Sequence, residues 1–230
     1  MTKTPVTITA DLPGDAALRI ARGLLPAVSR DDVTPTICGA MFELTDGRVQ
    51  ATATDRYRVH RMRQAAATTG TGTFIVPRPV LLWVTKNANT FGARALVGTG
   101  RIRFDFQPAD VAAESGSGTL HPAPAGNLTV TVYEDESPLA ARVAYFGALT
   151  KGNFPNVARL IDQARTAESH SGSLRVRSDF LGATAHLAPQ REVAPELIWT
   201  VSKNPNKPGP LLVQYAPDAE ALIQPNLNLR

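Results

Sequence analysis

The sequence of this 230-residue chain predicts an α+β protein in which helices pack on one face of curved antiparallel sheets. Asp46-Gly47 lies between two runs of alternating apolar residues, which is the strongest short-range signal of a β-hairpin. Residues 14–28 carry apolar side chains at helical spacing on one face. Residues 79–86 form a second, very apolar helix with proline in its first turn. A helix followed by a hairpin and a further strand favours antiparallel over parallel sheets.

The elements of the first half follow in order. A short strand at 6–10 leads into the helix at 14–28, where Pro26 kinks or terminates the last turn because proline lacks a backbone donor. The two arms of the hairpin come next, and a third strand starts after residues 54–58. A loop of small residues is expected at 65–72, then a strand at 74–77 that ends at the helix 79–86.

The second half is predicted to contain more strands than helices. Strands are expected at 101–106, 127–133, 141–149, 197–201, 211–215 and 221–223. Residues 110–125 are rich in Ala, Gly, Ser and Pro and are predicted to form a loop. One helix is expected from about Asp179, whose side chain can cap its first turn.

The composition excludes several classes of protein. An apolar fraction of 43% is enough to build a core, and no run approaches the ~18 apolar residues that span a bilayer. The first residues lack the charged-then-apolar order of a secretory signal. The single cysteine, Cys38, excludes an internal disulfide framework, and its apolar strand predicts a buried thiol. We therefore expect a cytoplasmic protein with no membrane partner.

Nothing in the sequence indicates an enzyme. His60, His121, His170 and His186 are scattered, without the spacing of metal ligands. There is no G-x-S-x-G motif, and the glycines of residues 92–100 lack the G-K-[S/T] ending of a phosphate-binding loop. We expect no catalytic residues, no metal and no cofactor.

Arginine accounts for 19 of the 24 basic residues, in a chain of net charge +4. Its planar guanidinium binds phosphate well, which favours a nucleic-acid partner. The alternative is codon composition, because Ala, Pro and Gly are abundant too. Arg19 and Arg22 lie opposite the apolar face of the helix 14–28, and Arg30 follows them in line. From position alone these residues form either a solvated surface or a phosphate-binding one.

The block 24–63 resembles the repeating unit of the bacterial DNA polymerase III β subunit, the sliding-clamp family. In that family a helix ending in L-P-x-x-S precedes a strand, a D/G-G turn and a strand closing on A-T-D-x-x-R. This chain has LPAVS at 25–29 and ATDRYR at 53–58. The strand–proline–helix passage at 74–86, GNFPNV at 152–157 and the tail ALIQPNLNLR are similar to further family segments. The resemblance is patchy over 94–126.

The resemblance implies a DNA-clamp fold. One clamp-type domain would span 1–165, with an insertion at about 94–126, and a second, shortened domain would span 166–230. Family members act as polymerase processivity factors: they encircle double-stranded DNA irrespective of its sequence and recruit DNA polymerase and other clamp-motif proteins through a hydrophobic peptide cleft. Six domains make a ring, and this chain is too short for three. The expectation is therefore a homo-oligomer, most simply a homotrimer. The alternative is an adaptor or decoy that forms no ring.

Two sets of functional residues follow from the resemblance. The expected DNA-binding residues are Arg19, Arg22, Arg30, Arg78 and Lys86. The expected residues of the partner-peptide cleft are Ile37, Thr54, Arg56, Tyr57, Arg58, Val59, Pro155, Arg159, Leu160, Arg177, Phe180, Leu222, Ile223 and Pro225. The chain departs from the family at Arg56, usually glycine, Arg177, usually asparagine, and Gln224, usually methionine. The aliphatic members are also compatible with ordinary core positions, whereas aromatic side chains anchor peptide grooves.

Overall fold

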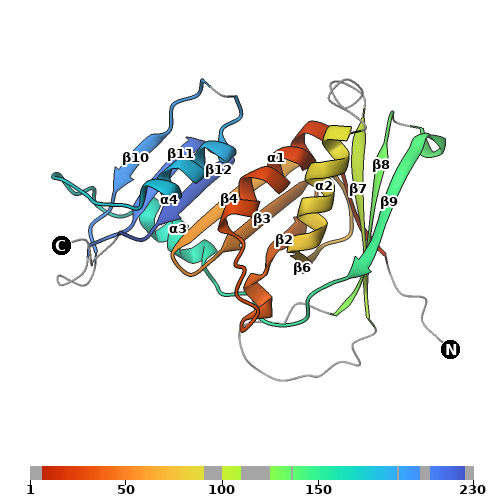
Figure 1. The fold of residues 1–230 in the computed structure, drawn as a ribbon, viewed down its shortest axis with the longest axis horizontal. Coiled ribbons are helices and arrows are strands. Elements are labelled where there is room, and N and C mark those ends of the chain that lie inside the picture. The colour runs from red at the N-terminus through yellow and green to blue at the C-terminus, as the bar shows by residue number, and fades with distance from the viewer. Residues whose placement is uncertain are drawn as a thin grey trace.

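The computed structural model describes residues 7–90, 100–109, 125–135, 137–190, 192–202 and 208–225. Two antiparallel sheets make up the fold, and helices α1, α2 and α4 lie on the same face of the larger sheet (Figure 1). This arrangement confirms the predicted α+β class. The proposed insertion at 94–126 lies largely outside the described residues.

The larger sheet combines strands from both ends of the chain. Its order is β10-β11-β12-β4-β3-β2-β6. The strands are β2 (Gly39–Thr45), β3 (Arg48–Thr54), β4 (Arg58–Ala65), β6 (Gly72–Pro77), β10 (Glu196–Trp199), β11 (Leu211–Ala216) and β12 (Ala219–Ile223). The hairpin β2–β3 turns at Gly47, whose φ of 70° is readily adopted only by glycine. Strand β12 pairs with β4, so the last strands continue the sheet that the hairpin begins.

The smaller sheet has the order β5-β1-β7-β8-β9. Its strands are β1 (Ile8–Pro13), β5 (Ala67–Thr69), β7 (Arg101–Pro108), β8 (Gly126–Tyr133) and β9 (Ala141–Ala148). The predicted loop at 65–72 is wrong in part, because β5 pairs with β1 and the hydroxyls of Thr9 and Thr69 lie 2.8 Å apart. The small residues of this segment show no alternation of apolar and polar side chains. Its assignment as a strand therefore depends on its pairing with β1.

The helices are α1 (Gly14–Leu24), α2 (Arg78–Thr90), α3 (Ala158–Arg165) and α4 (Ser178–Ala183). Helix α1 is shorter than the predicted 14–28, because Pro26 changes the last turn to the 3₁₀ helix η1 (Leu25–Ala27). Other 3₁₀ turns are η2 (Pro35–Ile37), η3 (Pro138–Ala140) and η4 (Thr184–Leu187). Helix α3 was not among the predicted elements.

Two local predictions are wrong. Asp179 does not cap α4; the N-cap is Arg177, and the Asp179 carboxylate accepts hydrogen bonds from the Arg177 guanidinium instead. Cys38 lies not within a strand but at the end of η2, half-buried, and its thiol donates to the carbonyl oxygen of Asp31 at 3.1 Å. Pro35 starts that turn because its fixed φ suits a first helical position.

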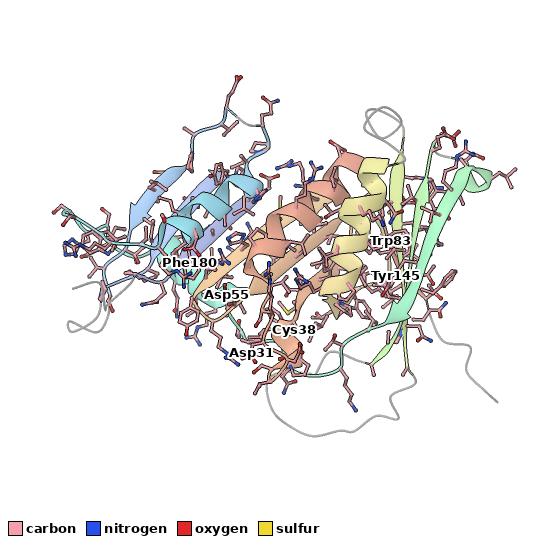
Figure 2. All side chains as sticks on the ribbon, viewed as in Figure 1. Asp31, Cys38, Asp55, Trp83, Tyr145 and Phe180 are labelled. Atoms are coloured by element: carbon pink, nitrogen blue, oxygen red, sulfur yellow. The ribbon has the colours of Figure 1, made fainter. Side chains whose placement is uncertain are left out.

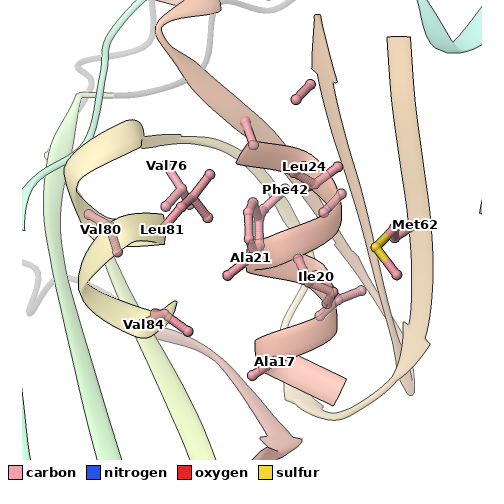
Figure 3. Close-up of a cluster of buried hydrophobic side chains, with 14 of the residues drawn as sticks. Ala17, Ile20, Ala21, Leu24, Phe42, Met62, Val76, Val80, Leu81 and Val84 are labelled. Carbon is pink, nitrogen blue, oxygen red and sulfur yellow. The ribbon is translucent and has the colours of Figure 1, made fainter. Parts of the chain in front are cut away.

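The main core lies between α1, α2 and the two sheets (Figure 3). The apolar face of α1 contributes Ala17, Ile20, Ala21 and Leu24, all essentially inaccessible to solvent. Gly23 allows α1 to approach β4 closely, since a Cβ atom there would lie 2.4 Å from the Met62 sulfur. The close contact positions the end of α1, where the functional site begins.

His60 of β4 is fully buried beneath α1. Its Nδ1 lies 2.6 Å from the carbonyl oxygen of Gly23, so we assign the proton to Nδ1 as the donor. Its Nε2 has no hydrogen-bond partner within the described part of the chain. Burial lowers the pKa of His60 to about 4, because a charged ring would lose its hydration there.

We expect the free energy of unfolding to fall as the pH is lowered from about 6.5 toward 4. In this window His60 binds a proton in the unfolded chain, at its ordinary pKa of 6.5, but not in the folded one. The loss would reach on the order of 3 kcal/mol, and it is absent above the unfolded pKa. Denaturant titrations of the native protein and the His60→Gln variant measure it. The same pH dependence in both proteins would contradict the assignment.

Candidate functional site

A pocket of about 930 Å³ opens between the end of α1, the β3–β4 turn, the start of α2 and α4. We call it the arginine pocket, because its charged lining consists mainly of that residue. The basic residues are Arg30, Arg56, Arg58, Arg78, Arg177 and His186, and the acidic ones are Asp31, Asp55 and Asp179. The larger apolar residues are Leu25, Pro26, Val28, Tyr57, Leu82 and Phe180. The pocket thus combines an apolar surface with an excess of positive charge.

Hydrogen bonds hold the β3–β4 turn in one conformation. The Asp55 carboxylate accepts from the backbone amides of Tyr57 and Arg58, at 3.1 and 3.0 Å, and from Nε of Arg58 at 2.9 Å. The hydroxyl of Thr54 donates to the carbonyl of Arg58 at 2.8 Å. Aspartate and threonine favour such turns because their side chains bond nearby backbone groups. The turn presents Tyr57, which is 62% exposed, at the pocket.

Arg56 occupies a strained position in this turn. Its φ of 78° lies in the left-handed region, which costs a residue with a side chain on the order of 1 kcal/mol. The guanidinium bonds to Asp31 Oδ2 at 3.2 Å and to the hydroxyl of Thr34. These contacts connect the turn to the 31–34 loop across the pocket.

Phe180 is the buried aromatic residue of the pocket, with 4% of its surface exposed. The guanidinium carbons of Arg58 and Arg177 lie 4.4 and 4.2 Å from its ring centroid, and the Tyr57 ring lies 6.4 Å away. The Arg177 guanidinium also lowers the pKa of Asp179 below its ordinary value. Phe180 of α4 and Asp55 of the turn both line the pocket, and Figure 2 labels them close together. Cations stacked on an aromatic ring form a preorganised surface.

The arginine pocket brings together residues from both predicted sets. From the predicted cleft it contains Arg56, Tyr57, Arg58, Arg177 and Phe180. From the predicted DNA-binding set it contains Arg30 and Arg78. Their proximity depends on α2 and α4 meeting the end of α1.

Other predicted cleft residues lie elsewhere. Val59 and Leu222 are buried with Leu212 under Ile161 and Ala164 of α3. Ile37 lies in a small cluster with Ile75 and Phe154, and Ile223 lies in the main core. Thr54 and Pro225 are buried as well. The exposed members of the set are Pro155, Arg159 and Leu160. Successive strand residues face opposite sides, which separates Leu222 from Ile223.

The remaining predicted DNA-binding residues lie on the two large helices. Arg22 of α1 and Lys86 of α2 are exposed, and α1 and α2 pack side by side on the larger sheet (Figure 1). Arg19 is half-buried, with Nη2 3.9 Å from a carboxylate oxygen of Asp218. The three cations therefore belong to the helix-covered face of the molecule.

A buried ion cluster on the other face of the sheet was not predicted. Glu220 is fully buried and accepts hydrogen bonds from Arg61, at 2.9 and 3.1 Å, from Arg63 at 3.3 Å and from Arg165 at 2.5 Å. Arg61 also donates to Asp162 of α3 at 2.8 Å. The cluster fastens α3 to the sheet. The only signal in the sequence is a glutamate within the apolar strand 219–223, and its partners are distant along the chain.

The described ranges contain no group of three or more His, Cys, Asp or Glu side chains that could hold a metal ion. None of their helices is both long and apolar enough to cross a bilayer.

No protein-family model and no curated protein matches the sequence. Solved structures do match the fold. A protein from Eubacterium rectale described as a DNA polymerase III β subunit aligns with 100% of this chain and 69% of its own, at a TM-score of 0.62 and 10% identity. The β subunit of Thermotoga maritima aligns with 98% of this chain and 67% of its own, at a TM-score of 0.55 and 10% identity.

The DNA polymerase sliding clamp of Bacillus subtilis is similar over 95% of this chain and 64% of its own, at a TM-score of 0.54 and 15% identity. The chain thus spans about two thirds of the length of these structures. At such low identity the likeness establishes the fold alone. It confirms the sliding-clamp fold predicted from the sequence.

Proposed function

Because the chain has the sliding-clamp fold along its whole length, we propose that it is a DNA sliding clamp. It would act without catalysis, as a processivity factor that encircles duplex DNA and recruits DNA polymerase and other replication proteins. The fold match is the observation that carries this proposal. The proposed arrangement is a first clamp-type domain over 1–165 and a shortened one over 166–230.

The proposed DNA-binding surface is the helix-covered face. Arg19 and Arg22 of α1 and Lys86 of α2 supply cations there. Such side chains neutralise phosphates without reading bases, so binding would be independent of sequence and sensitive to salt.

The proposed assembly is a homo-oligomer, most simply a homotrimer. Among the described residues, β9 ends the smaller sheet and β10 ends the larger one, and the two lie at opposite ends of the molecule (Figure 1). Each presents an exposed apolar side chain, Phe146 at 76% and Leu197 at 52% exposure. An exposed strand edge with apolar side chains favours pairing with another chain, and pairing between different edges closes a ring.

Topological retention on DNA tests the proposal. A closed ring assembled on nicked circular duplex DNA should remain bound through gel filtration at high salt and be released when the circle is linearised. Light scattering at micromolar concentration should give a trimer mass. If the protein dissociated from circular and linear DNA at the same rate, encirclement would be refuted.

The second candidate is an adaptor or decoy that keeps the pocket but forms no ring. It is favoured by the small size of the structured part after α3, where α4, η4 and strands β10–β12 are the elements among the described residues. A monomer mass unchanged by DNA, together with binding to clamp-interacting peptides, would establish this function instead.

The arginine pocket is the proposed partner site, with Phe180 as its aromatic anchor. We expect Phe180→Ala to weaken binding of a short peptide that carries Gln and bulky apolar side chains by on the order of 2 kcal/mol, as is typical of a buried aromatic anchor. Fluorescence anisotropy of the labelled peptide measures the change. Leu139→Ala, which shortens an exposed apolar side chain of η3 outside the pocket, is the control and should leave affinity unchanged. Equal affinity of the Phe180 variant and the native protein would refute the site.

A further inference from the structure

We propose that a second pocket, on the face of the larger sheet opposite α1 and α2, binds a phosphate group, either as free phosphate or as a phosphate monoester. The pocket has a volume of about 650 Å³ and lies where the β2–β3 turn, the end of β4, the end of α3 and the β11–β12 turn meet. We call it the outer pocket. Its charged lining consists of Arg48, Arg63, Arg165 and Asp218. The inference is independent of the proposed DNA binding, which uses the helix-covered face.

Three arginines from different elements converge on the outer pocket. In the register of β3 with β4, Gln50 is opposite Arg63, and Arg48 lies two residues from Gln50. Residues two apart on a strand face the same side, so Arg48 and Arg63 are diagonal neighbours on one face of the sheet. Arg165 reaches the same region from α3, because its Nε and Nη1 of Arg63 both donate to the Glu220 carboxylate, at 2.5 and 3.3 Å. The sheet and α3 thus concentrate guanidinium groups at one place.

Arg63 is held in position while part of its guanidinium stays available. Its Nε donates to the Gln50 side chain at 2.8 Å and its Nη1 to the carbonyl oxygen of Pro217 at 3.0 Å. In the described part of the chain, Nη2 of Arg63 and both terminal nitrogens of Arg165 donate to no carboxylate or carbonyl that lines the outer pocket. Burial, and then the neighbouring Arg61 guanidinium, lower the pKa of Arg63 below its ordinary value. A bound anion would offset that repulsion.

The carboxylates near the outer pocket do not cancel its positive charge. Glu220 lies beneath it and is shared among three guanidinium groups. The Asp218 carboxylate already has partners, because it accepts a hydrogen bond from the Gln64 side chain at 3.1 Å and lies 3.9 Å from Arg19 of α1. Arg48 forms no ion pair with any carboxylate among the described residues. Positive charge is therefore left for a ligand.

A phosphate group suits this lining. At pH 7 a phosphate monoester carries about two negative charges and three acceptor oxygens, which several guanidinium groups can contact at once. The uncharged lining includes Gly47, Ala65 and Pro217, which offer no aromatic surface on which a base could stack. A phosphodiester within a nucleic-acid strand has a smaller charge and fewer free oxygens. The outer pocket therefore favours a compact phosphate over a run of nucleotides.

Calorimetric titration of the full chain with inorganic phosphate, at constant ionic strength, tests the inference. The native protein should bind phosphate, and Arg48→Gln should weaken binding about tenfold, because one charged hydrogen-bond donor is lost. Arg48 is exposed and outside the buried ion cluster, so unaltered thermal unfolding is expected for this variant. The matched control is Arg159→Gln, which removes an exposed arginine of α3 outside the outer pocket and should bind phosphate like the native protein.

Glycerol 3-phosphate distinguishes the two sources of the phosphate group. Binding of inorganic phosphate alone would identify free phosphate as the ligand, whereas equal or tighter binding of glycerol 3-phosphate would identify a monoester. Failure of the native protein to bind either compound, or equal affinities of the native protein and the Arg48 variant, would overturn the inference. A single-stranded oligonucleotide without terminal phosphates supplies the last arm. If it displaced bound phosphate from the native protein, the outer pocket would be a nucleic-acid surface instead.

Discussion

Replacing Glu220 by Ala should lower the free energy of unfolding by about 3–5 kcal/mol, because it removes one partner from a buried ion cluster. Glu220 is fully buried, and the Arg61 side chain beside it is only 2% exposed. Without the carboxylate, the Arg61 guanidinium would keep a long hydrogen bond to the carbonyl oxygen of Ala158, at 3.4 Å, and its ion pair with Asp162, whose own side chain is 59% exposed. A buried charge that loses its principal partner cannot recover its hydration, so the folded state is destabilised more than by the loss of a surface pair.

Denaturant unfolding of the Glu220→Ala variant measures this effect. Glu196→Ala, which removes an exposed carboxylate from β10, is the matched control and should change stability by no more than about 0.5 kcal/mol. Hydrogen exchange adds a local test: the amides of α3 should exchange faster in the Glu220 variant, because Asp162 and Arg165 are connected to the sheet through this cluster. Equal stabilities of the two variants would show that the cluster contributes no net stability.

The second large effect is expected in the salt dependence of DNA binding. Replacing Arg19, Arg22 and Lys86 together by Gln should reduce the slope of log affinity against log salt by up to about 3 units on duplex DNA. Each side chain that neutralises a phosphate releases a condensed counterion, so the slope reports the number of such contacts. The measurement is a series of binding titrations on one duplex at increasing salt.

A control variant with the same change in net charge distinguishes contacts between α1 or α2 and the DNA phosphates from attraction of DNA by the net charge of the protein. Arg48, Arg142 and Arg159 are exposed and lie outside helices α1 and α2, and their replacement by Gln should leave the slope nearly unchanged. An equal loss of slope in the control would mean that net charge, rather than the helix-covered face, attracts the DNA.

Local chemistry in the sequence determined much of the fold. Asp46-Gly47 specifies a hairpin because glycine tolerates the positive φ of the turn, and the apolar alternation on both arms sets the register. The spacing of Ile20, Ala21 and Leu24 predicts the buried face of α1, and Pro26 marks its end. Each of these signals lies within a few residues of the element it specifies, so each can be read without the tertiary structure.

Only the tertiary structure decided how distant segments meet. Strand β5 lacks alternation and exists through its pairing with β1, and α3 is held to the sheet by Glu220, which lies 55 residues from Arg165 along the chain. Arg30 and Arg78 come from different elements, and the packing of α2 and η4 against α1 brings them into one pocket with Phe180 of α4. Burial and charge balance depend on neighbours in space, whereas propensity and periodicity depend on neighbours in sequence. The sequence alone therefore determined the fold class and most of the elements, and the tertiary structure decided how β5 and α3 form and which charged side chains pair.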